Sequence, residues 1–589
     1  MINNLIFSNF VRNELLMFLM KYMKYKLLII FVLSFNFLFA QKESFPQYPN
    51  PVKIPISLSA TFAELRTNAF HAGVDIRTQG VEGKEVFAVA DGYVSRIGVS
   101  PFGYGKVIYI THNDGFTSVY AHLSKFNQKI TDFVREKQYE TESFAQNIIL
   151  KENQFPIKKG DYLGLTGNSG SSGGPHLHYE IRYTKTQEPI NPMYFGLKIK
   201  DTKKPFIKGL AIYPLDNSAV NNSDTAIYLD VISKGSKFYL ENKEFKVNGK
   251  IAFGINVYDQ ADGSNNKNGA YSVELFADNE LIFSIVSNKY SYDETRYINS
   301  MMDYSYFIKN NERFIRTEID EFNRLNNLYE RTSGVVNVNE GDTLNMKYVV
   351  KDYNKNKSVL NFKLIGAELP ELETPKVLPR SYYRIYDGES SEIYLDAFES
   401  DIPEFAFYRD VELKTARIDT IKNIYSYYAY QLGSEEIPLH KKITIRLKPK
   451  KEYISDSGLY VAALNRKGEF VFLGNKIIND FIEAKTNVLG VYLIAKDTIK
   501  PTIKPVNFKG DSSIADNWSL RVEIDDKETG VNKYEMLIND EWVLADYDAK
   551  NKLLIYQIDK HIKKGHNTLK VIVTDMVGNE TVYQTILQR

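Results

Sequence analysis

The sequence has no cysteine, only 2 tryptophans and almost no excess of charge of either sign. The absence of cysteine excludes disulfides, thiolate metal sites, a cysteine nucleophile and a lipid-anchored lipoprotein amino terminus. The 74 lysines and arginines are balanced by 73 acidic residues, so the chain has no large excess of positive charge with which to bind nucleic acid. We therefore expect no nucleic-acid partner.

Long hydrophobic runs are missing beyond the amino-terminal segment. Three lysines precede an apolar run from Leu27 to Phe39, and Ala40 follows it. A membrane-spanning helix needs about 20 apolar residues, so this run has the length of a signal peptide. The pattern predicts a signal peptide over residues 20–40, cleavage near Ala40 and export to the periplasm or cell envelope. An uncleaved membrane anchor is the alternative.

Aromatic residues are abundant, with 41 tyrosines and 35 phenylalanines. These residues favour strands, and short strand-like segments separated by glycine turns recur through the sequence. A chain of 589 residues is also too long for one ordinary hydrophobic core. The sequence therefore predicts a mainly β protein of several domains.

A weak internal repeat suggests where the domains divide. KDTKKP at residues 200–205 recurs as KDTIKP at 496–501, and two further landmarks follow each copy in the same order. We therefore expect β-sandwich, Ig-like domains at 200–366 and 496–589, a third β domain at 367–495 between them, and an amino-terminal domain at 41–199.

Two helical segments are expected among the strands. The stretch ITDFVREKQYETES is predicted to form a helix, followed by a strand at NIILK, within an insertion at 124–157 in the amino-terminal domain. The stretch at 314–330 is predicted to add a helix to the first sandwich. Acidic residues of the two sandwiches are interpreted as solvated turn residues rather than calcium ligands, because their spacing matches no recognised calcium loop. These residues are Asp259, Asp262, Asp525 and Asp526.

Five of the 8 histidines lie in the amino-terminal domain: His71, His112, His122, His176 and His178. His71 and Asp75 are four residues apart, and His176 and His178 are two apart, so each pair faces one side of an extended strand. Imidazole and carboxylate groups suit zinc, and three protein ligands leave the fourth tetrahedral position open for water. The remaining imidazoles are available to handle protons and to stabilise an oxyanion.

These residues stand in a recognisable order: His71-x-x-x-Asp75, then Tyr120-Ala-His122-Leu, then GLTGNSGSSGGPHLHYEI. The order resembles that of the lysostaphin/LytM-type murein metallopeptidases over about residues 50–197. The resemblance implies a compact antiparallel β domain of the duplicated-hybrid-motif type with a groove over the metal. It further implies hydrolysis of peptide bonds in peptidoglycan stem peptides or cross-links.

Individual roles also follow from the resemblance. It implies that His71, Asp75 and His178 bind Zn²⁺ and that His122 and His176 are catalytic. Some relatives have lost metal ligands and act as non-hydrolytic activators or scaffolds for cell-wall amidases, whereas this sequence keeps all five positions. A metallopeptidase acting on a protein substrate is a further alternative. The β domains are compatible with a spacer, a wall-binding module or a surface for an envelope protein partner, and the sequence does not indicate an oligomeric state.

The other conspicuous residues of the chain have less specific interpretations. His112 lies at a turn, where we expect a structural role. Glu180 shares the parity of His176 and His178, so it either orients a ligand or is an exposed strand carboxylate. The glycine-rich run at 164–174 lacks the ending of a phosphate loop and is expected to shape the backbone beside the site. The three remaining histidines are predicted to be solvated: His440, His561 and His566.

Overall fold

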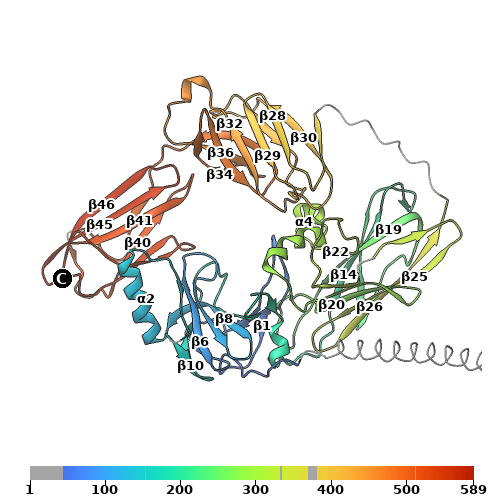
Figure 1. Ribbon diagram of the computed structural model, residues 1–589, viewed down its shortest axis with the longest axis horizontal. Coiled ribbons are helices and arrows are strands. Elements are labelled where there is room, and N and C mark those ends of the chain that lie inside the picture. The colour runs from blue at the N-terminus through green and yellow to red at the C-terminus, as the bar shows by residue number, and fades with distance from the viewer. Residues whose placement is uncertain (1–43, 153, 332–333, 369–380, 511) are drawn as a thin grey trace, which may run out of the picture. The chain divides into compact units, whose positions relative to one another are not determined.

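The computed structural model describes residues 44–589 except 153, 332–333, 369–380 and 511. The elements below belong to the compact unit Tyr48–Arg589. The predicted signal peptide at 20–40 lies outside the described residues. Within the described ranges, no helix is both long enough and apolar enough to cross a membrane. Strands dominate these ranges, which confirms the mainly β prediction (Figure 1).

The first sheet carries the candidate site. Among the described residues its main path runs, in spatial order, through β1 (Leu58–Ala60), β4 (Val74–Arg77), β12 (His176–Tyr183), β8 (Phe116–Phe126), β7 (Lys106–His112), β6 (Gly92–Val99) and β10 (Pro156–Ile157). Four further strands pair off this path: β5 (Glu85–Phe87), β9 (Gln146–Ile149), β11 (Tyr162–Thr166) and β13 (Pro189–Ile190). The hairpin of β2 (Leu65–Arg66) and β3 (Ala69–Phe70) precedes β4, and the 3-10 helix Pro192–Phe195 follows β13. All the pairings of this sheet are antiparallel, so residues distant in sequence meet at its centre.

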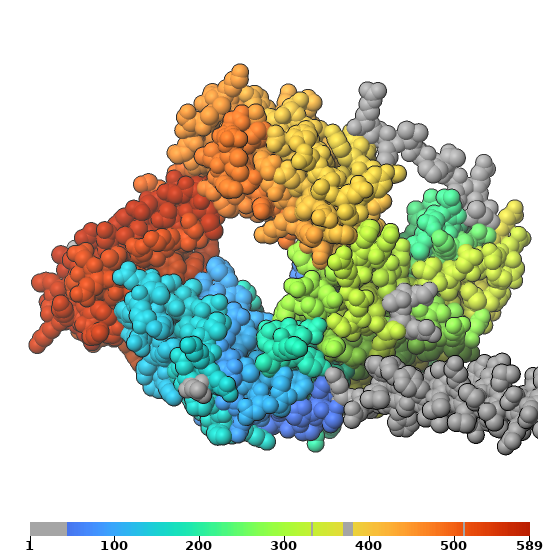
Figure 2. Space-filling model, in the orientation of Figure 1, coloured from blue at the N-terminus to red at the C-terminus, as the bar shows by residue number. Residues whose placement is uncertain are grey.

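The predicted helix and strand of the insertion are both confirmed. The helix is α2 (Gln128–Glu140), and β9 follows it. Ile130, Val134 and Gln138 recur every four residues and form its buried face, as an amphipathic helix requires. In the space-filling view, the cyan residues of this region lie at the surface beside red residues of the last strands (Figure 2). Arg135 forms an ion pair with Asp559 there.

The second group of strands covers residues 206–366. Its main path is β16 (Ile227–Asp230), β14 (Phe206–Pro214), β19 (Glu244–Tyr258), β26 (Lys357–Gly366), β25 (Thr343–Lys351), β20 (Ser272–Ala277), β21 (Glu280–Val286) and β23 (Tyr329–Arg331). Three strands pair with β19 off this path: β15 (Ala219–Val220), β22 (Ile315–Arg316) and β24 (Val336–Val338). A separate hairpin joins β17 (Ile232–Lys234) to β18 (Lys237–Tyr239). Buried and more exposed residues alternate along β26, which is the period of a sheet with one face on the core.

The helix predicted at 314–330 is wrong. The helical residues come earlier, in the 3-10 helix Tyr292–Tyr297, α3 (Ile298–Met301) and α4 (Tyr304–Asn310). The stretch at 314–330 instead starts with strand β22, which pairs with the long strand β19. Asn323 then caps a turn by accepting a hydrogen bond from the Leu325 amide at 2.8 Å. Tertiary pairing has therefore overridden local helix propensity here.

Two facing sheets follow at residues 382–496. One contains β27 (Tyr382–Ile385), β30 (Val411–Ile418), β31 (Ala429–Leu432), β37 (Gly490–Lys496), β33 (Leu459–Leu464) and β34 (Phe470–Gly474). The other contains β28 (Ser391–Leu395), β29 (Phe398–Ile402), β32 (Ile443–Leu447), β36 (Phe481–Thr486) and β35 (Lys476–Ile478). The 3-10 helix Lys451–Tyr453 connects β32 to β33. Inward side chains of both sheets, such as Ile393, Phe398, Tyr430 and Tyr492, form one buried cluster.

The last two sheets complete the chain. One contains β38 (Thr502–Pro505), β40 (Ser519–Asp525), β44 (Leu553–Gln557) and β43 (Ala545–Asp548). The other contains β39 (Ser512–Ser513), β46 (Glu580–Gln588), β45 (His566–Asp575), β41 (Val531–Ile538) and β42 (Glu541–Trp542). The pairings β38–β40, β41–β45, β45–β46 and β41–β42 match, in chain order, β14–β19, β20–β25, β25–β26 and β20–β21. The repeat seen in the sequence thus recurs in the strand pairing.

Candidate metal centre

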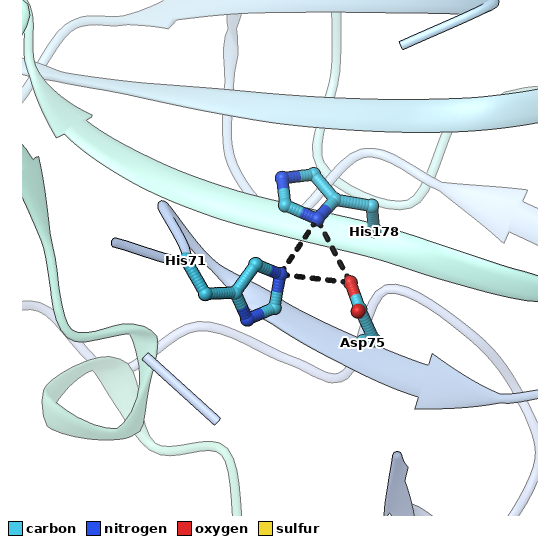
Figure 3. Close-up of side chains that lie close together, drawn as sticks. All are labelled: His71, Asp75 and His178. Atoms are coloured by element: carbon cyan, nitrogen blue, oxygen red, sulfur yellow. Dashed lines mark hydrogen bonds and ion pairs between the residues drawn. The ribbon is translucent and has the colours of Figure 1, made fainter. Parts of the chain in front are cut away.

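Three side chains converge at the centre of the first sheet. His71 Nε2 lies 3.0 Å from Asp75 Oδ1, and His178 Nδ1 lies 2.8 Å from the same oxygen and 3.0 Å from His71 Nε2. Figure 3 shows the three atoms turned toward one another. All three residues are buried, with His71 only 2% exposed. Two nitrogens and one carboxylate oxygen in this arrangement form a group that fits a zinc ion.

The strand register explains why these residues meet. In the antiparallel pairing of β12 with β4, His178 lies directly opposite Asp75. His176 and His178 lie on one face of β12, as predicted. His71 lies outside a strand, four residues before Asp75 and just ahead of β4, so the two side chains converge through a bend and not through strand parity. A Cβ on Gly73 at this bend would lie 2.3 Å from the Tyr179 carbonyl oxygen, so the motif needs glycine there.

Hydrogen bonds on the outer sides of the ligands fix their orientation. His71 Nδ1 donates to the Thr61 carbonyl at 2.8 Å, which leaves Nε2 facing the site. Asp75 uses its second oxygen to pair with Arg66 Nη2 at 2.7 Å. His178 Nε2 contacts Glu180 Oε1 at 2.7 Å, which leaves Nδ1 for the site. Such partners hold imidazole ligands in one tautomer and one orientation.

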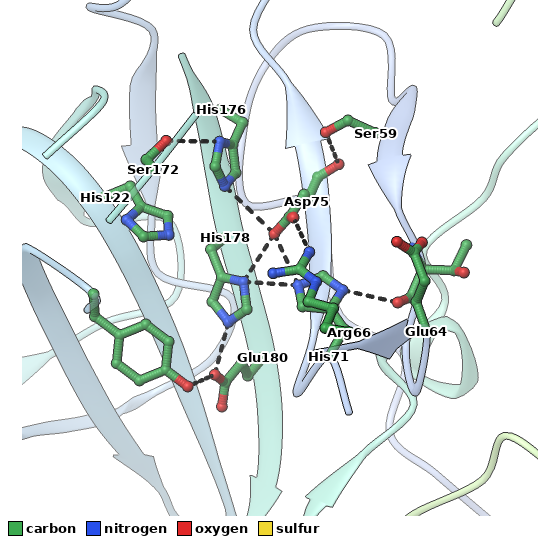
Figure 4. A network of polar contacts seen from close by, with 12 residues as sticks. Ser59, Glu64, Arg66, His71, Asp75, His122, Ser172, His176, His178 and Glu180 are labelled. Carbon is green, nitrogen blue, oxygen red and sulfur yellow. Dashed lines mark hydrogen bonds and ion pairs between the residues drawn. The ribbon is translucent and has the colours of Figure 1, made fainter. Parts of the chain in front are cut away.

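Glu180 belongs to a buried polar network, and Figure 4 shows its contact with His178. It is fully buried, so of the two sequence interpretations the exposed carboxylate is wrong. Besides His178, it accepts hydrogen bonds from Tyr104 at 2.5 Å, Tyr292 at 3.0 Å and Arg182 Nε at 2.7 Å. Sequence reasoning missed Tyr104, Arg182 and Tyr292. Arg182 could have been inferred from the sequence, because it continues the parity of His176, His178 and Glu180 along β12. Nothing in the sequence pointed to the two tyrosines.

His122 and His176 lie beside the three converging residues. Their ring centroids are 4.8 Å apart, and the His122 ring lies 5.8 Å from that of His178. His122 Nδ1 donates to the Ser169 carbonyl at 2.9 Å and His176 Nδ1 to the Gly174 carbonyl at 2.8 Å. Each ring therefore presents Nε2 toward the site, and His176 Nε2 is 3.5 Å from Asp75 Oδ1.

The backbone of His122 is unusual. Its φ of 60° lies in the left-handed region, where a residue with a Cβ is strained by about 1–3 kcal/mol. The strain coincides with an irregularity in the pairing of β8, and the His122 amide donates to the Tyr104 carbonyl at 3.0 Å. This conformation turns the His122 side chain toward His176 and His178.

Burial and neighbouring charges set the pKa values of the site in the absence of metal. Burial lowers the pKa of His71, and burial with the nearby His178 and His176 lowers that of His122 to about 3. Burial opposes ionisation of Asp75 and Glu180, but their imidazole and arginine neighbours outweigh it and hold both pKa values below the usual range. Burial likewise disfavours the charged form of His178, yet Asp75 and Glu180 raise its pKa to about 9.

The glycine-rich run supports the site through its backbone. A Cβ on Gly167 would lie 2.3 Å from the Ser124 amide nitrogen, and one on Gly170 would lie 2.4 Å from the Gly103 carbonyl oxygen. These two glycines therefore permit backbone to approach backbone. The loop they shape presents the Ser169 carbonyl to His122.

The remaining histidines lie away from the converging residues. His112 is buried and bonds to the Asp91 carbonyl at 3.1 Å and to Ser118 Oγ at 2.7 Å, which is a structural placement. His566 is exposed, as predicted. The solvated interpretation is wrong for the other two, because aromatic rings cover them. His440 stacks on Tyr297 at 4.4 Å, and His561 stacks on Tyr139 at 5.3 Å.

Comparison with known proteins bears on the same region. Residues 69–143 match the profile described as Peptidase family M23. This part of the chain is similar to the M23 peptidases, and we refer to it as the M23 domain. The match includes the His71-x-x-x-Asp75 motif and His122, so the predicted family resemblance is confirmed. Residues 385–497 match the profile of the Zu5-like domain, which the sequence analysis did not foresee.

The relatives of the M23 domain are named as a peptidase, an activator and a cell division protein. The chain is 32% identical over 133 residues to the DD-carboxypeptidase/endopeptidase Mpg of Neisseria meningitidis, covering 23% of this chain and 24% of that protein. It is 33% identical over 123 residues to the murein hydrolase activator NlpD of Escherichia coli, covering 21% and 25%. It is 27% identical over 137 residues to the cell division protein DipM of Caulobacter vibrioides, covering 23% and 18%. The chain thus spans a quarter or less of the length of these relatives.

Proposed function

We propose that the M23 domain, assigned to residues 41–199, is a zinc-dependent metalloendopeptidase that hydrolyses peptide bonds in peptidoglycan stem peptides or cross-links. The observation that carries this proposal is the convergence of His71 Nε2, Asp75 Oδ1 and His178 Nδ1 within 3.0 Å of one another beside two further imidazoles. A protein that only activates other enzymes by binding them does not need this complete set of three converging side chains and two further imidazoles.

The three converging residues are assigned as the zinc ligands. Each presents one donor atom, and each is held from outside by Thr61, Arg66 or Glu180. When bound, zinc supplies a Lewis acid that polarises a carbonyl and lowers the pKa of a water molecule to about 7. The pairing of His178 Nε2 with Glu180 makes the imidazole a stronger ligand through Nδ1.

His122 and His176 are assigned as the catalytic residues. Because each Nδ1 donates to a backbone carbonyl, Nε2 is the nitrogen that takes or gives a proton at the site. In the neutral ring Nε2 accepts a proton from the attacking water, and in the protonated ring it donates to the developing oxyanion or leaving amine. Burial of the His122 ring, together with the nearby His178 and His176, lowers the pKa of His122 and favours its neutral form before the reaction starts.

The setting of the reaction follows from the predicted signal peptide at 20–40, which directs the protein to the periplasm or cell envelope. Peptidoglycan, whose glycan strands are cross-linked by short peptides, is present there. The β domains at 200–366, 367–495 and 496–589, two of them proposed to be Ig-like, are assigned to positioning of the M23 domain or to docking of an envelope protein. The helix α2 of the 124–157 insertion follows directly on β8, which carries His122, and we assign the insertion to substrate selection.

The test is digestion of isolated peptidoglycan by purified residues 41–589 with stoichiometric zinc. We expect loss of cross-linked muropeptide dimers and new peptide termini by mass spectrometry. His176→Ala and chelator-treated protein should release nothing, whereas the matched control His566→Ala, at an exposed histidine outside the site, should keep full activity. Cleavage that persists in His176→Ala would contradict the proposed mechanism.

Two measurements separate the endopeptidase from its alternatives. His178→Ala should bind less zinc than the parent, and equal binding would contradict the ligand assignment. An amidase activator would release no peptides itself and would stimulate an added amidase even in His176→Ala. The name of the relative NlpD says only that it activates a murein hydrolase. If zinc binds without cleavage, a variant with residues 124–157 shortened decides whether the insertion closes the site.

A further inference from the structure

A second group of acidic side chains meets in the first sandwich. Asp201 precedes β14, Asp259 follows β19 and Asp352 follows β25, and one oxygen of each turns toward the others. Asp259 is only 7% exposed and Asp352 only 3%. The interpretation of Asp259 as a solvated turn residue is therefore wrong. Asp262, which was predicted together with Asp259 to be a solvated turn residue, is not part of this group. It accepts a hydrogen bond from the Thr202 amide at 3.1 Å.

Two oxygens in this pocket have no protein donor. Asp259 Oδ1 and the amide oxygen of Asn268 are buried without a hydrogen bond. Asn268 is 3% exposed and lines the same pocket as Asp201, Asp259 and Asp352. Leaving a buried polar atom unpaired costs about 1–3 kcal/mol, and more for a charged group. An amide oxygen and a carboxylate that both lack donors point to a bound cation.

The surrounding contacts hold the oxygens in place without neutralising them. Asp352 accepts from the Asn356 amide at 2.8 Å and from Asn356 Nδ2 at 2.7 Å. Asn356 Nδ2 also donates to the Asp201 carbonyl at 3.1 Å, and the Lys203 amide donates to Asp201 Oδ1 at 3.0 Å. The Lys203 ammonium donates instead to the Ser264 carbonyl. Among the described residues, no lysine or arginine forms an ion pair with the three carboxylates.

We propose that this pocket binds a calcium ion through carboxylate oxygens of Asp201, Asp259 and Asp352 and the amide oxygen of Asn268. A set made only of oxygens suits a hard cation and not zinc. Calcium accepts six to eight oxygen ligands in irregular arrangements, whereas magnesium demands near-octahedral geometry and keeps several waters. A buried pocket formed by protein oxygens therefore favours calcium.

The corresponding residues of the last sandwich provide an internal comparison. Asp497, Asp526 and Asp575 form a similar group, and Asn579 bonds to Asp575 as Asn356 does to Asp352. Protein donors reach more of the oxygens of this second group, although Asp526 Oδ2 is also buried without a hydrogen bond. Thr529 Oγ1 donates to Asp497 Oδ2 at 2.8 Å, and the Gly530 amide donates to Asp526 Oδ1 at 2.7 Å. The proposal concerns the first group, where Asn268 supplies the additional unpaired oxygen.

The experiment is a calorimetric titration of the purified protein with calcium chloride, after chelation and reloading with one equivalent of zinc. We expect Asp259→Asn to bind one calcium fewer than the parent. Asp224→Asn, which changes an exposed aspartate followed by threonine as Asp201 is, should bind as many as the parent. Asp526→Asn should retain the calcium assigned to the first pocket. Magnesium chloride at the same concentration should not displace that ion.

A second measurement uses the parent protein alone. Calcium should raise its unfolding temperature, because an ion that binds only the folded state stabilises it by mass action. Circular dichroism establishes that Asp259→Asn is folded before its titration is compared. Absence of calcium binding by the parent, or equal stoichiometry in folded Asp259→Asn, would overturn the proposal. Neither result depends on peptidase activity, so this proposal and the proposed function can fail separately.

Discussion

Glu180 illustrates how one buried carboxylate can orient a residue of the candidate metal centre without being one of the three converging side chains. It contacts His178 Nε2 at 2.7 Å while Arg182 and two tyrosines hold it in place. The arginine compensates its charge, and this is why the pKa of Glu180 stays low despite complete burial. The carboxylate therefore fixes the imidazole with Nδ1 toward Asp75.

Replacing this group should weaken metal binding more than it weakens folding. We expect Glu180→Gln to lower zinc affinity about ten- to a hundredfold, because partners of this kind typically contribute that much. Competition with a chromophoric chelator measures the affinity, and thermal unfolding of the metal-free protein monitors the fold.

The matched control is Glu82→Gln, which changes an exposed glutamate of the same domain and should leave zinc affinity unchanged. Equal zinc affinity in Glu180→Gln and the parent would show that the imidazole orientation is fixed without the carboxylate.

Among the secondary-structure elements, α2 connects the strand that bears His122 to the rest of the insertion. The side chain of Asn127 caps the first turn: its Oδ1 accepts from the Ile130 amide at 3.0 Å, and its Nδ2 donates to the Tyr162 carbonyl at 3.0 Å. The cap thus joins the start of the helix to β11, which leads into the loop that carries Ser169.

Loss of this cap should loosen α2. We expect Asn127→Ala to destabilise the helix by about 1 kcal/mol, the typical cost of removing an amino-terminal cap. Hydrogen exchange of peptides covering 128–140 should become faster in this variant. Glu136→Ala, at an exposed position of the same helix, should leave exchange unchanged, and equal exchange in the two variants would contradict the role of the cap.

At the scale of the whole molecule, a histidine outside the site also contributes to the dependence of stability on pH. His440 lies against Tyr297 and Tyr408, and its Nδ1 is buried without a hydrogen bond. Burial, helped by the nearby charges of Arg296, Lys441 and Arg324, lowers its pKa from 6.5 to about 4. The folded protein therefore keeps this imidazole neutral where the unfolded chain takes up a proton.

The sign of the effect follows from this difference in proton binding. Between pH 6.5 and about 4 the unfolded state binds more protons at this position, so the free energy of unfolding should fall as the pH drops through that window. The loss at the lower end is about 3 kcal/mol at most.

His440→Phe, which keeps a ring on Tyr297, should show a smaller loss of stability between pH 7 and pH 4. Urea unfolding, monitored by hydrogen exchange of peptides that cover β32, measures the free energy of unfolding at each pH. The variant His566→Phe, at an exposed histidine, should show the same pH dependence as the parent. The same pH dependence in His440→Phe and the parent would contradict this explanation.

The sequence by itself determined the mainly β fold, the M23 motifs and the shared face of His176 and His178. Strand parity places His176 and His178 on one face, and parity is a local property that a sequence displays directly. The helix α2 was also predicted from the sequence, and its buried residues recur every four positions.

Only the tertiary structure decided which groups surround these motifs. The partners of Glu180 come from the turn before β7, from β12 and from a helix of the next sandwich, and the aspartates of the proposed calcium pocket are up to 151 residues apart. The stretch at 314–330 became strand and turn because β19 offered it a pairing partner. Contacts between distant segments depend on how the sheets pack and on which buried charges are left without a partner. Local residue patterns do not contain this information.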